Sequence, residues 1–255
     1  MNHEAAGGRP GVLASTRRGE YGVDAPYAPI GFALAALVAA AGAAVVWWNT
    51  GRVITPPLIV SLFFVGNTAS FLYTTRRGKF TEWARILDAL ALHGDERVLD
   101  IGCGRGAVLT AVARRLRSGR VTGVDLWIAR DQSGNARDVT LRNAALEGVA
   151  ERVAVETGDM RALPFADASF DLVVSSLAIH NPASNADRVR AVGEAWRVLA
   201  PGGRLVIADI RATRVYESTL AGLGAAVTRR RLGWRFWWGN PVAGTSLVAA
   251  SKPAS

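Results

Sequence analysis

The sequence of 255 residues is poor in cysteine and lysine. Its single cysteine, Cys103, excludes an internal disulfide and fits a reducing compartment. Its only lysines, Lys79 and Lys252, do not form the Tyr-x-x-x-Lys pair of many NAD-dependent oxidoreductases, which disfavours that class. Internal repeats and low-complexity linkers are also absent. A disulfide-stapled scaffold and a repeat architecture are therefore excluded.

Charge is absent from two long apolar stretches, residues 30–48 and 53–73. Nineteen helical residues span about 28 Å, which is close to the hydrocarbon thickness of a bilayer. About 29 residues precede the first stretch, more than a signal peptide normally has before its apolar core. The pattern predicts a two-helix membrane hairpin over residues 28–74. A buried soluble hairpin and a single span with an interfacial second segment remain as alternatives.

Basic residues flank the predicted hairpin, whereas its connecting loop holds only Arg52. The positive-inside rule therefore places residues 1–27 and the domain that follows the hairpin, residues 75–255, in the cytoplasm. The formal net charge of +9 fits attraction to anionic lipid headgroups, nucleic-acid binding or a solvated basic surface. With a membrane hairpin attached, headgroup attraction is the preferred specific interpretation.

Strand-like and helix-like segments alternate along the chain after residue 73. Strands are predicted at Val98–Ile101, Val121–Asp125, Val153–Glu156, Phe170–Ser175 and Arg204–Ala208, and helices at Thr81–Leu92, Ala107–Leu116, Ala136–Glu147 and Ala186–Leu199. Two further β-type segments, Ala225–Trp238 and Thr245–Ser251, end the chain. This alternation predicts an α/β fold with a doubly wound, mostly parallel sheet and an antiparallel edge.

A glycine cluster follows the first predicted strand. Gly102, Gly104 and Gly106 form a GxGxG pattern, with Asp100 two residues before it and Asp125 at the end of the next strand. Glycines let the backbone approach a ligand, and a carboxylate about 20 residues on can accept from two ribose hydroxyls. An acid just before the glycines suits a cofactor with positive charge near its ribose and suits the diphosphate of NAD poorly. The pattern indicates S-adenosylmethionine.

Four stretches, at residues 98–106, 121–127, 158–181 and 199–210, resemble the class I S-adenosylmethionine-dependent methyltransferases. The resemblance is strongest to the ubiquinone/menaquinone-biosynthesis branch and covers roughly Thr81 to Pro253. It implies a Rossmann-like sheet of seven strands in which only the last strand is antiparallel. It implies no metal.

The resemblance also implies a cofactor site. The glycines, with Cys103 between them, would lie beneath the methionine and ribose, Asp100 would orient the amino group and Asp125 would hold the ribose. Residues implied to contact adenine or to lie beside the sulfonium are Leu126, Trp127, Asp159, Met160, Ser175 and Ser176. His180, just after the fourth strand, is the candidate base, although a packing role is the alternative.

Two features depart from the family pattern. Only one helix fits between the hairpin and the first strand, so the usual helical lid is not expected, and residues 131–135 interrupt the run from second strand to next helix. That helix, Thr81–Leu92, should pack antiparallel to the first strand, with its beginning at the carboxyl edge of the sheet. The mouth of the site should therefore face the bilayer.

The methyl acceptor is predicted to be a small apolar or membrane-resident molecule such as a lipid or an isoprenoid quinone. The segment Ser175–Ala178 lacks the Asn/Asp-Pro-Pro-aromatic signature of nucleic-acid amino-methyltransferases, so no nucleic acid is expected. Trp234–Trp238 could line an apolar pocket, enter the headgroup layer or pack in the core. A membrane-tethered, non-catalytic cofactor-binding module is the alternative function. The methylated atom and the oligomeric state are left open.

Overall fold

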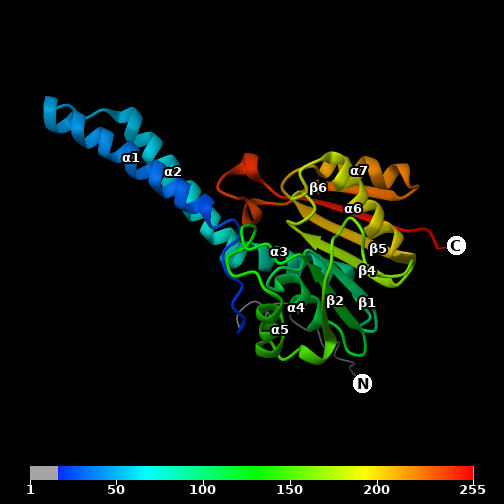
Figure 1. Cartoon of the computed structure of the whole chain (residues 1–255). Helices are drawn as coiled ribbons and strands as arrows, with labels where there is room; N and C mark the ends of the chain where they lie inside the picture. The colour runs from blue at the N-terminus through cyan, green and yellow to red at the C-terminus, as the bar shows by residue number, and fades with distance from the viewer. Residues whose placement is uncertain (1–16, 255) are drawn as a thin grey trace, which may run out of the picture.

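The structure, a computed structural model, describes residues 17–254. A pair of long helices projects from an α/β body that carries one central sheet (Figure 1). The two regions meet at one edge of the sheet.

The projecting pair consists of α1 (Tyr27–Thr50) and α2 (Thr55–Tyr73). Helix α1 ends at Gly51, whose φ of +66° is a left-handed conformation that glycine adopts without strain. Helix α2 begins with Pro56 and Pro57, where the missing N–H groups cost least. Both helices are long and apolar enough to cross a membrane.

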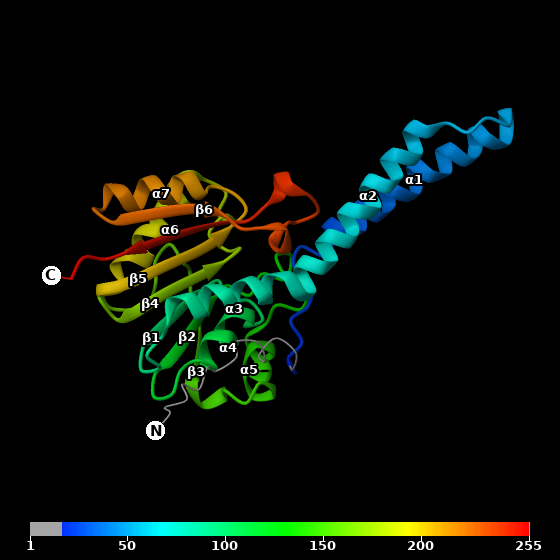
Figure 2. The same cartoon turned by 180° about the vertical axis from the view of Figure 1, so that it is seen from behind.

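Helix α2 runs without a loop into the α/β body (Figure 2). A π-helical turn, η1 (Thr74–Gly78), connects it to α3 (Lys79–Leu90). A Cβ on Gly78 would lie 1.8 Å from the carbonyl oxygen of Arg235, so the close approach of the C-terminal segment requires glycine here. The hairpin is thus continuous with the helix that precedes the first strand.

The sheet contains seven strands in the order β3-β2-β1-β4-β5-β7-β6, and only β7 is antiparallel to its neighbours. The predicted doubly wound sheet is confirmed. The strands are β1 (Arg97–Ile101), β2 (Arg120–Asp125), β3 (Val153–Thr157), β4 (Phe170–Ser176), β5 (Leu199–Asp209), β6 (Ala226–Arg231) and β7 (Ser246–Ser251). The last strand in sequence lies one place in from the edge, which β6 occupies.

Helices cover both faces of the sheet because side chains alternate along each strand. Val98 of β1 packs in the core with α3, α4 and α5, whereas Leu99 packs in the core with α6 and α7. The remaining helices are α4 (Ala107–Ala113), α5 (Arg137–Leu146), α6 (Asn185–Arg197) and α7 (Thr213–Gly222), with a short 3₁₀ turn η2 (Ala150–Arg152). This arrangement leaves the carboxyl edge of the sheet open toward the hairpin.

Two predicted elements differ from the structure near the C-terminus. The prediction of a strand over Ala225–Trp238 is wrong beyond Arg231, because Phe236 and Trp238 turn back to pack in the core beside α2. This stretch forms two 3₁₀ turns, η3 (Trp234–Phe236) and η4 (Pro241–Ala243). Helix α7 was not predicted, because its apolar signal is short and only Tyr216 and Leu220 are buried.

Residues 17–26, here named the N-terminal strap, pack along the α/β body. The backbone N–H of Glu20 donates to Asn143 Oδ1 (2.8 Å), and the hydroxyl of Tyr21 donates to Glu147 Oε1 (2.8 Å). Asp24 pairs with Gln132 in an isolated antiparallel bridge. The strap therefore joins α5 and the 131–135 loop before the chain enters α1.

Candidate active site

One cavity of about 920 Å³ lies at the carboxyl ends of β1, β2 and β4. Its lining comes from the glycine loop, the strap, the base of the hairpin, the start of α3 and the C-terminal turns. The cavity has a polar end beside the glycine loop and an aromatic end beside the hairpin.

The glycine loop forms the floor of the polar end. Gly102 has φ +70°, and a Cβ there would lie 2.1 Å from Cβ of Ala178. Gly104 has φ +51°, and its backbone N–H donates to Asp125 Oδ2 (2.8 Å). Both positions require glycine for conformation and for space. The loop is thereby held against the carboxylate at the end of β2.

Asp100 is buried at this end, with 1% of its surface exposed. Neither carboxylate oxygen has a hydrogen-bond partner among residues 17–254. Burial, reinforced by the nearby charge of Asp125, raises the pKa of Asp100 to about 8. A buried carboxylate without a partner on a cavity wall is suited to a cationic ligand group.

Asp125 retains accepting capacity toward the cavity. Its Oδ1 accepts from the backbone N–H of Trp127 (2.7 Å) and from Asn135 Nδ2 (3.2 Å), and Oδ2 accepts from Gly104. Two carboxylate oxygens offer about four lone-pair directions, so at least one remains for a ligand hydroxyl.

Most of the residues predicted to hold the cofactor line this cavity. They are Asp100, Gly102, Cys103, Gly104, Asp125, Leu126, Asp159, Met160 and Ser176. The structure does not bring Gly106, Trp127 or Ser175 to the lining. Gly106 turns the chain into α4 with φ +83°, and the indole of Trp127 donates to Thr157 Oγ1 (2.8 Å). The hydroxyl of Ser175 donates to the carbonyl of Ile101 (2.8 Å), so it ties β4 to β1.

Cys103 lies within the glycine loop and is buried. Burial raises the pKa of its thiol well above the usual value, and the charges of Asp100 and Asp125 act in the same direction. The thiolate is the reactive form, so this environment disfavours a nucleophilic role and agrees with a small loop residue.

The 131–135 loop and the strap cover the polar end, a role that the sequence did not reveal. Gln132 accepts from the backbone N–H of Arg105 (2.8 Å) and donates to Asp24 Oδ1 (2.9 Å). Asp24 in turn forms an ion pair with Lys79 (2.5 Å) and accepts from Thr75 Oγ1 (2.7 Å). A chain of polar contacts thus connects the glycine loop to the base of the hairpin. Within residues 17–254, these segments and not a helical lid cover the polar end of the site.

Aromatic side chains from four separate segments form the other end. They are Phe32 of α1, Phe71 of α2, Phe80 and Trp83 of α3, and Trp238 after η3. The rings of Phe71 and Trp238 meet edge to face at 5.0 Å between centroids. Trp83 Nε1 donates to Ser176 Oγ (2.9 Å), which links this end to the last residue of β4. The cavity therefore runs from the carboxylates to the base of the hairpin.

His180 lines the cavity between the two ends. Its Nδ1 lies 2.5 Å from Asp209 Oδ1, at ion-pair distance, and its backbone N–H donates to Asp209 Oδ2 (3.1 Å). Tyr216 also donates to Asp209 Oδ2 (3.1 Å), and burial raises the pKa of that tyrosine. Asp209 is fully buried and lies within ion-pair distance of the imidazole, but His180 Nδ1 makes no hydrogen bond of regular geometry among the described residues. Sequence reasoning missed Asp209.

The residues present fit S-adenosylmethionine. The unpartnered carboxylate of Asp100 suits the cationic amino group, and Asp125 suits the ribose hydroxyls. Leu126 and Met160 line the same polar end and offer apolar contact for a purine ring.

Comparisons with known proteins agree with this geometry. A family profile described as a methyltransferase domain matches residues 98–203. A 27-O-demethylrifamycin SV methyltransferase of Amycolatopsis mediterranei is 38% identical over 149 residues, covering 58% of this chain and 49% of the relative. A demethylmenaquinone methyltransferase of Deinococcus radiodurans is 33% identical over 153 residues, covering 58% of this chain and 54% of the relative. The chain thus spans about half the length of these relatives.

A solved structure shares the fold. The geranyl diphosphate C-methyltransferase of Streptomyces coelicolor aligns with a TM-score of 0.55 at 19% identity, covering 68% of this chain and 77% of that one. The methyltransferase assignment leaves no support for the alternative of an NAD-dependent oxidoreductase. The sequence motifs, the sheet topology and these matches together show that the chain contains a methyltransferase domain of the class I S-adenosylmethionine-dependent type.

Proposed function

We propose that this protein is anchored in a membrane by α1 and α2 and transfers a methyl group to an apolar, membrane-resident acceptor. The observation that carries the proposal is the single cavity in which cofactor-type carboxylates and the aromatic base of the hairpin share one space. A lipid, an isoprenoid quinone or a similar apolar molecule fits the aromatic end.

The surface of the hairpin supports the membrane anchor. Large apolar side chains such as Val38 (73% exposed) and Leu62 (72% exposed) face outward along the projecting helices. A bilayer would cover this surface, which is larger than soluble monomers expose. Arg76 and Arg77 lie just beyond α2, whereas Arg52 is the only charge at the far tip, so both termini and the α/β body should lie in the cytoplasm.

The continuity of α2 with α3 supports an active site at the bilayer surface. Phe80 and Trp83 of α3 line the cavity, only a few residues beyond the end of α2. Phe32, near the start of α1, and Phe71, near the end of α2, line the same cavity. An acceptor partitioned in the membrane could therefore reach the site without crossing water. The relatives named for demethylmenaquinone and geranyl diphosphate supply examples of quinone and isoprenoid acceptors within this fold.

When bound, S-adenosylmethionine supplies an electrophilic methyl group on a sulfonium. The protein's part is to align the acceptor near attack distance and to remove its proton where the acceptor requires it. His180 is proposed as the base, since the buried carboxylate of Asp209 lies 2.5 Å from its Nδ1 and would stabilise the imidazolium that proton uptake produces. Asp100, Gly102, Gly104 and Asp125 are proposed to hold the cofactor.

The test uses the full chain in membranes with radiolabelled S-adenosylmethionine and a lipid extract of the host. We expect label in the organic phase, and we expect the protein to resist carbonate extraction. Label confined to polar metabolites would contradict an apolar acceptor. Protein that is soluble without detergent would contradict the anchor. Cofactor binding without transfer to any extract fraction would favour the non-catalytic module.

A further inference from the structure

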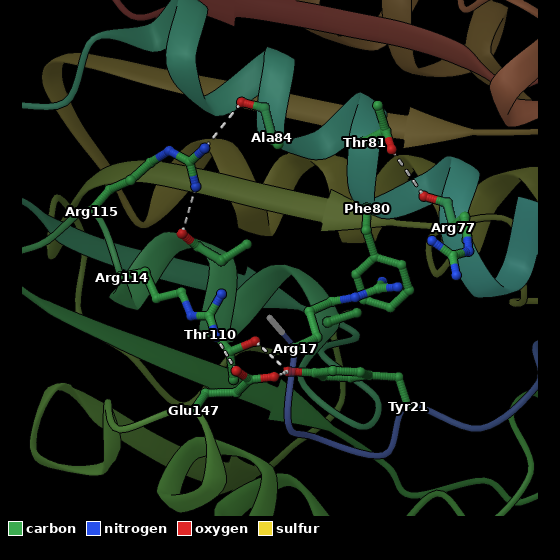
Figure 3. Close-up of a pocket in the computed structure, with 12 residues that line it drawn as sticks. Arg17, Tyr21, Arg77, Phe80, Thr81, Ala84, Thr110, Arg114, Arg115 and Glu147 are labelled. Carbon is green, nitrogen blue, oxygen red and sulfur yellow. Dashed lines mark hydrogen bonds and ion pairs between the residues drawn. The ribbon is translucent and has the colours of Figure 1, made fainter. Parts of the chain in front are cut away.

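A second cavity, of about 130 Å³, lies between α3, α4 and the strap. Figure 3 shows its lining, with Arg17 in the middle, Arg77 at one end, and Arg114 and Arg115 at the other. This space, here named the arginine cavity, shares Phe80, Ala107 and Ala111 with the active-site cavity. It is far too small for the cofactor, and none of the roles proposed above uses it.

The arginine cavity holds more positive than negative charge. Its one carboxylate, Glu147, is already occupied by Arg114, by the hydroxyl of Tyr21 and by two backbone N–H groups of the strap. Arg115 pairs with Asp88 (2.6 Å). Of the four arginines that line the cavity, Arg114 and Arg115 are therefore each paired with a carboxylate.

Arg17 and Arg77 have no carboxylate partner among residues 17–254. The guanidinium of Arg17 lies 3.4 Å from the ring centroid of Phe80 (Figure 3) and donates to the carbonyl of Arg76 (2.7 Å). These contacts fix its position but give it no carboxylate partner among the described residues. Burial lowers the pKa of Arg17, and Arg77 and Arg114 add to this shift, whereas Tyr21 and Glu147 oppose it. The cavity is thus a preformed site for an anion.

The position of the cavity indicates what kind of anion it meets. Arg77 lies four residues beyond Tyr73, where α2 ends, and Thr81 lies one further turn along the continuous helix. If α2 spans the bilayer, this places the cavity at the depth of lipid phosphates. Guanidinium groups bind phosphate through paired, charge-assisted hydrogen bonds.

We propose that the arginine cavity binds a phosphate group, carried either by an anionic lipid headgroup or by a soluble phosphate ester. Arg17 and Arg77 supply the uncompensated charge, and Phe80 holds Arg17 in place. The lipid is the favoured source because of the depth of the cavity. The site is separate from methyl transfer, but Phe80 forms a common wall between it and the acceptor end.

The test uses the purified full chain in a neutral detergent. Short-chain phosphatidylglycerol, phosphatidylcholine and inorganic phosphate are titrated in separate arms, and bound ligand is counted by native mass spectrometry. We expect phosphatidylglycerol to bind, and we expect Arg17→Gln and Arg77→Gln each to weaken it about tenfold. Arg77→Lys, which keeps the charge but loses paired bonding, should show an intermediate loss.

Arg76→Gln is the matched control, because Arg76 lies at the same depth and is exposed but does not line the cavity. It should change phosphatidylglycerol binding by less than about twofold. Affinity for S-adenosylhomocysteine should stay unchanged in every variant, which reports an intact fold. If Arg76→Gln and Arg77→Gln weaken phosphatidylglycerol binding equally, or if neither weakens it, the lipid binds by general electrostatic attraction and the proposal is overturned. Variant-sensitive binding of inorganic phosphate alone would support the site and assign a soluble ligand.

Lipid binding to the arginine cavity is measured without methyl transfer. Failure to find a methyl acceptor would therefore leave the lipid-binding result unaffected. Conversely, if the arginine cavity binds no phosphate group, the proposal that this protein methylates a membrane-resident acceptor would still stand.

Discussion

The polar end of the active-site cavity comes mainly from two neighbouring strands and the loops that follow them, whereas the aromatic end is assembled from α1, α2, α3 and the turn after η3. The polar end uses backbone N–H groups and carboxylates at fixed places on the sheet edge. The aromatic end uses side chains that are far apart in sequence and depends on how the hairpin meets the body. Cofactor binding should therefore tolerate changes in the hairpin, and acceptor choice should not.

Asp100 and Asp209 illustrate the same contrast within the cavity. Both are buried, but Asp100 has no partner, whereas Asp209 accepts from Tyr216 and from two backbone N–H groups and lies against His180. An unpartnered buried carboxylate is costly and therefore marks a site for a cationic ligand, while a satisfied one positions a neighbour. Substitution of Asp100 should therefore change cofactor binding, whereas substitution of Asp209 should change kcat.

The largest effect is expected at the polar end. Asp125→Ala should cost about 2–4 kcal/mol of S-adenosylhomocysteine binding, because it removes the charge-assisted bonding to the ribose and the anchor of the Gly104 N–H. Isothermal calorimetry on the full chain measures this. Asp138→Ala, which removes an exposed acid from the first turn of α5, is the control. Similar affinities for both variants would contradict the ribose role.

The next effect separates proton transfer from binding. Asp209→Asn should lower kcat about 100-fold while leaving S-adenosylhomocysteine affinity unchanged, because the imidazole loses the carboxylate beside it. His180→Gln should cause a similar loss, and the double variant should add little to it. An unchanged kcat in both variants would assign His180 and Asp209 to packing.

A smaller effect is expected at the aromatic end. Phe32→Ala should raise KM for an apolar acceptor about tenfold through lost contact area, with cofactor affinity unchanged. Phe63→Ala is the matched control, since Phe63 is 55% exposed on α2 and does not line the cavity. Equal KM values for the two variants would remove α1 from the acceptor site.

The smallest effect is a pH dependence of cofactor binding. Because burial and Asp125 raise the pKa of Asp100 to about 8, the free protein holds Asp100 largely protonated at pH 7. A cationic amino group selects the ionised form, so affinity for S-adenosylhomocysteine should rise about fivefold between pH 7 and 8 and then level off. Asp100→Asn should abolish this rise, although any titration of the ligand itself would remain. The same slope in both proteins would contradict the assignment.

The unliganded protein should show the linked stability effect. A raised pKa means that the folded state holds its proton more tightly than the unfolded chain does, so Asp100 should destabilise the fold progressively as pH rises from about 4 to 8. Asp100→Asn should therefore raise the Tm of the cofactor-free chain at pH 8 more than at pH 5.

Much of the fold was predictable from sequence because its signals are local. The strands β1 to β4 are short apolar runs bounded by turns, and the glycine loop needs residues that tolerate positive φ. The C-terminal segment was predicted incorrectly because Phe236 and Trp238 have strong strand propensity, but their burial beside α2 overrides it. Ser175 was predicted to lie beside the cofactor, but its hydroxyl bonds to the carbonyl of Ile101 in β1. Successive side chains of a strand point in opposite directions, and it is Ser176 that lines the cavity.

The sequence alone determined the fold class, the cofactor type and the two apolar helices, because periodicity, glycine spacing and charge are properties of neighbouring residues. Only the tertiary structure decided what covers the site. The strap reaches Gln132 over more than 100 residues of sequence, and Asp209 meets His180 across two strands. The aromatic end and the arginine cavity likewise exist only where separate segments pack together. Such contacts depend on the registry of packed elements, which no local pattern encodes.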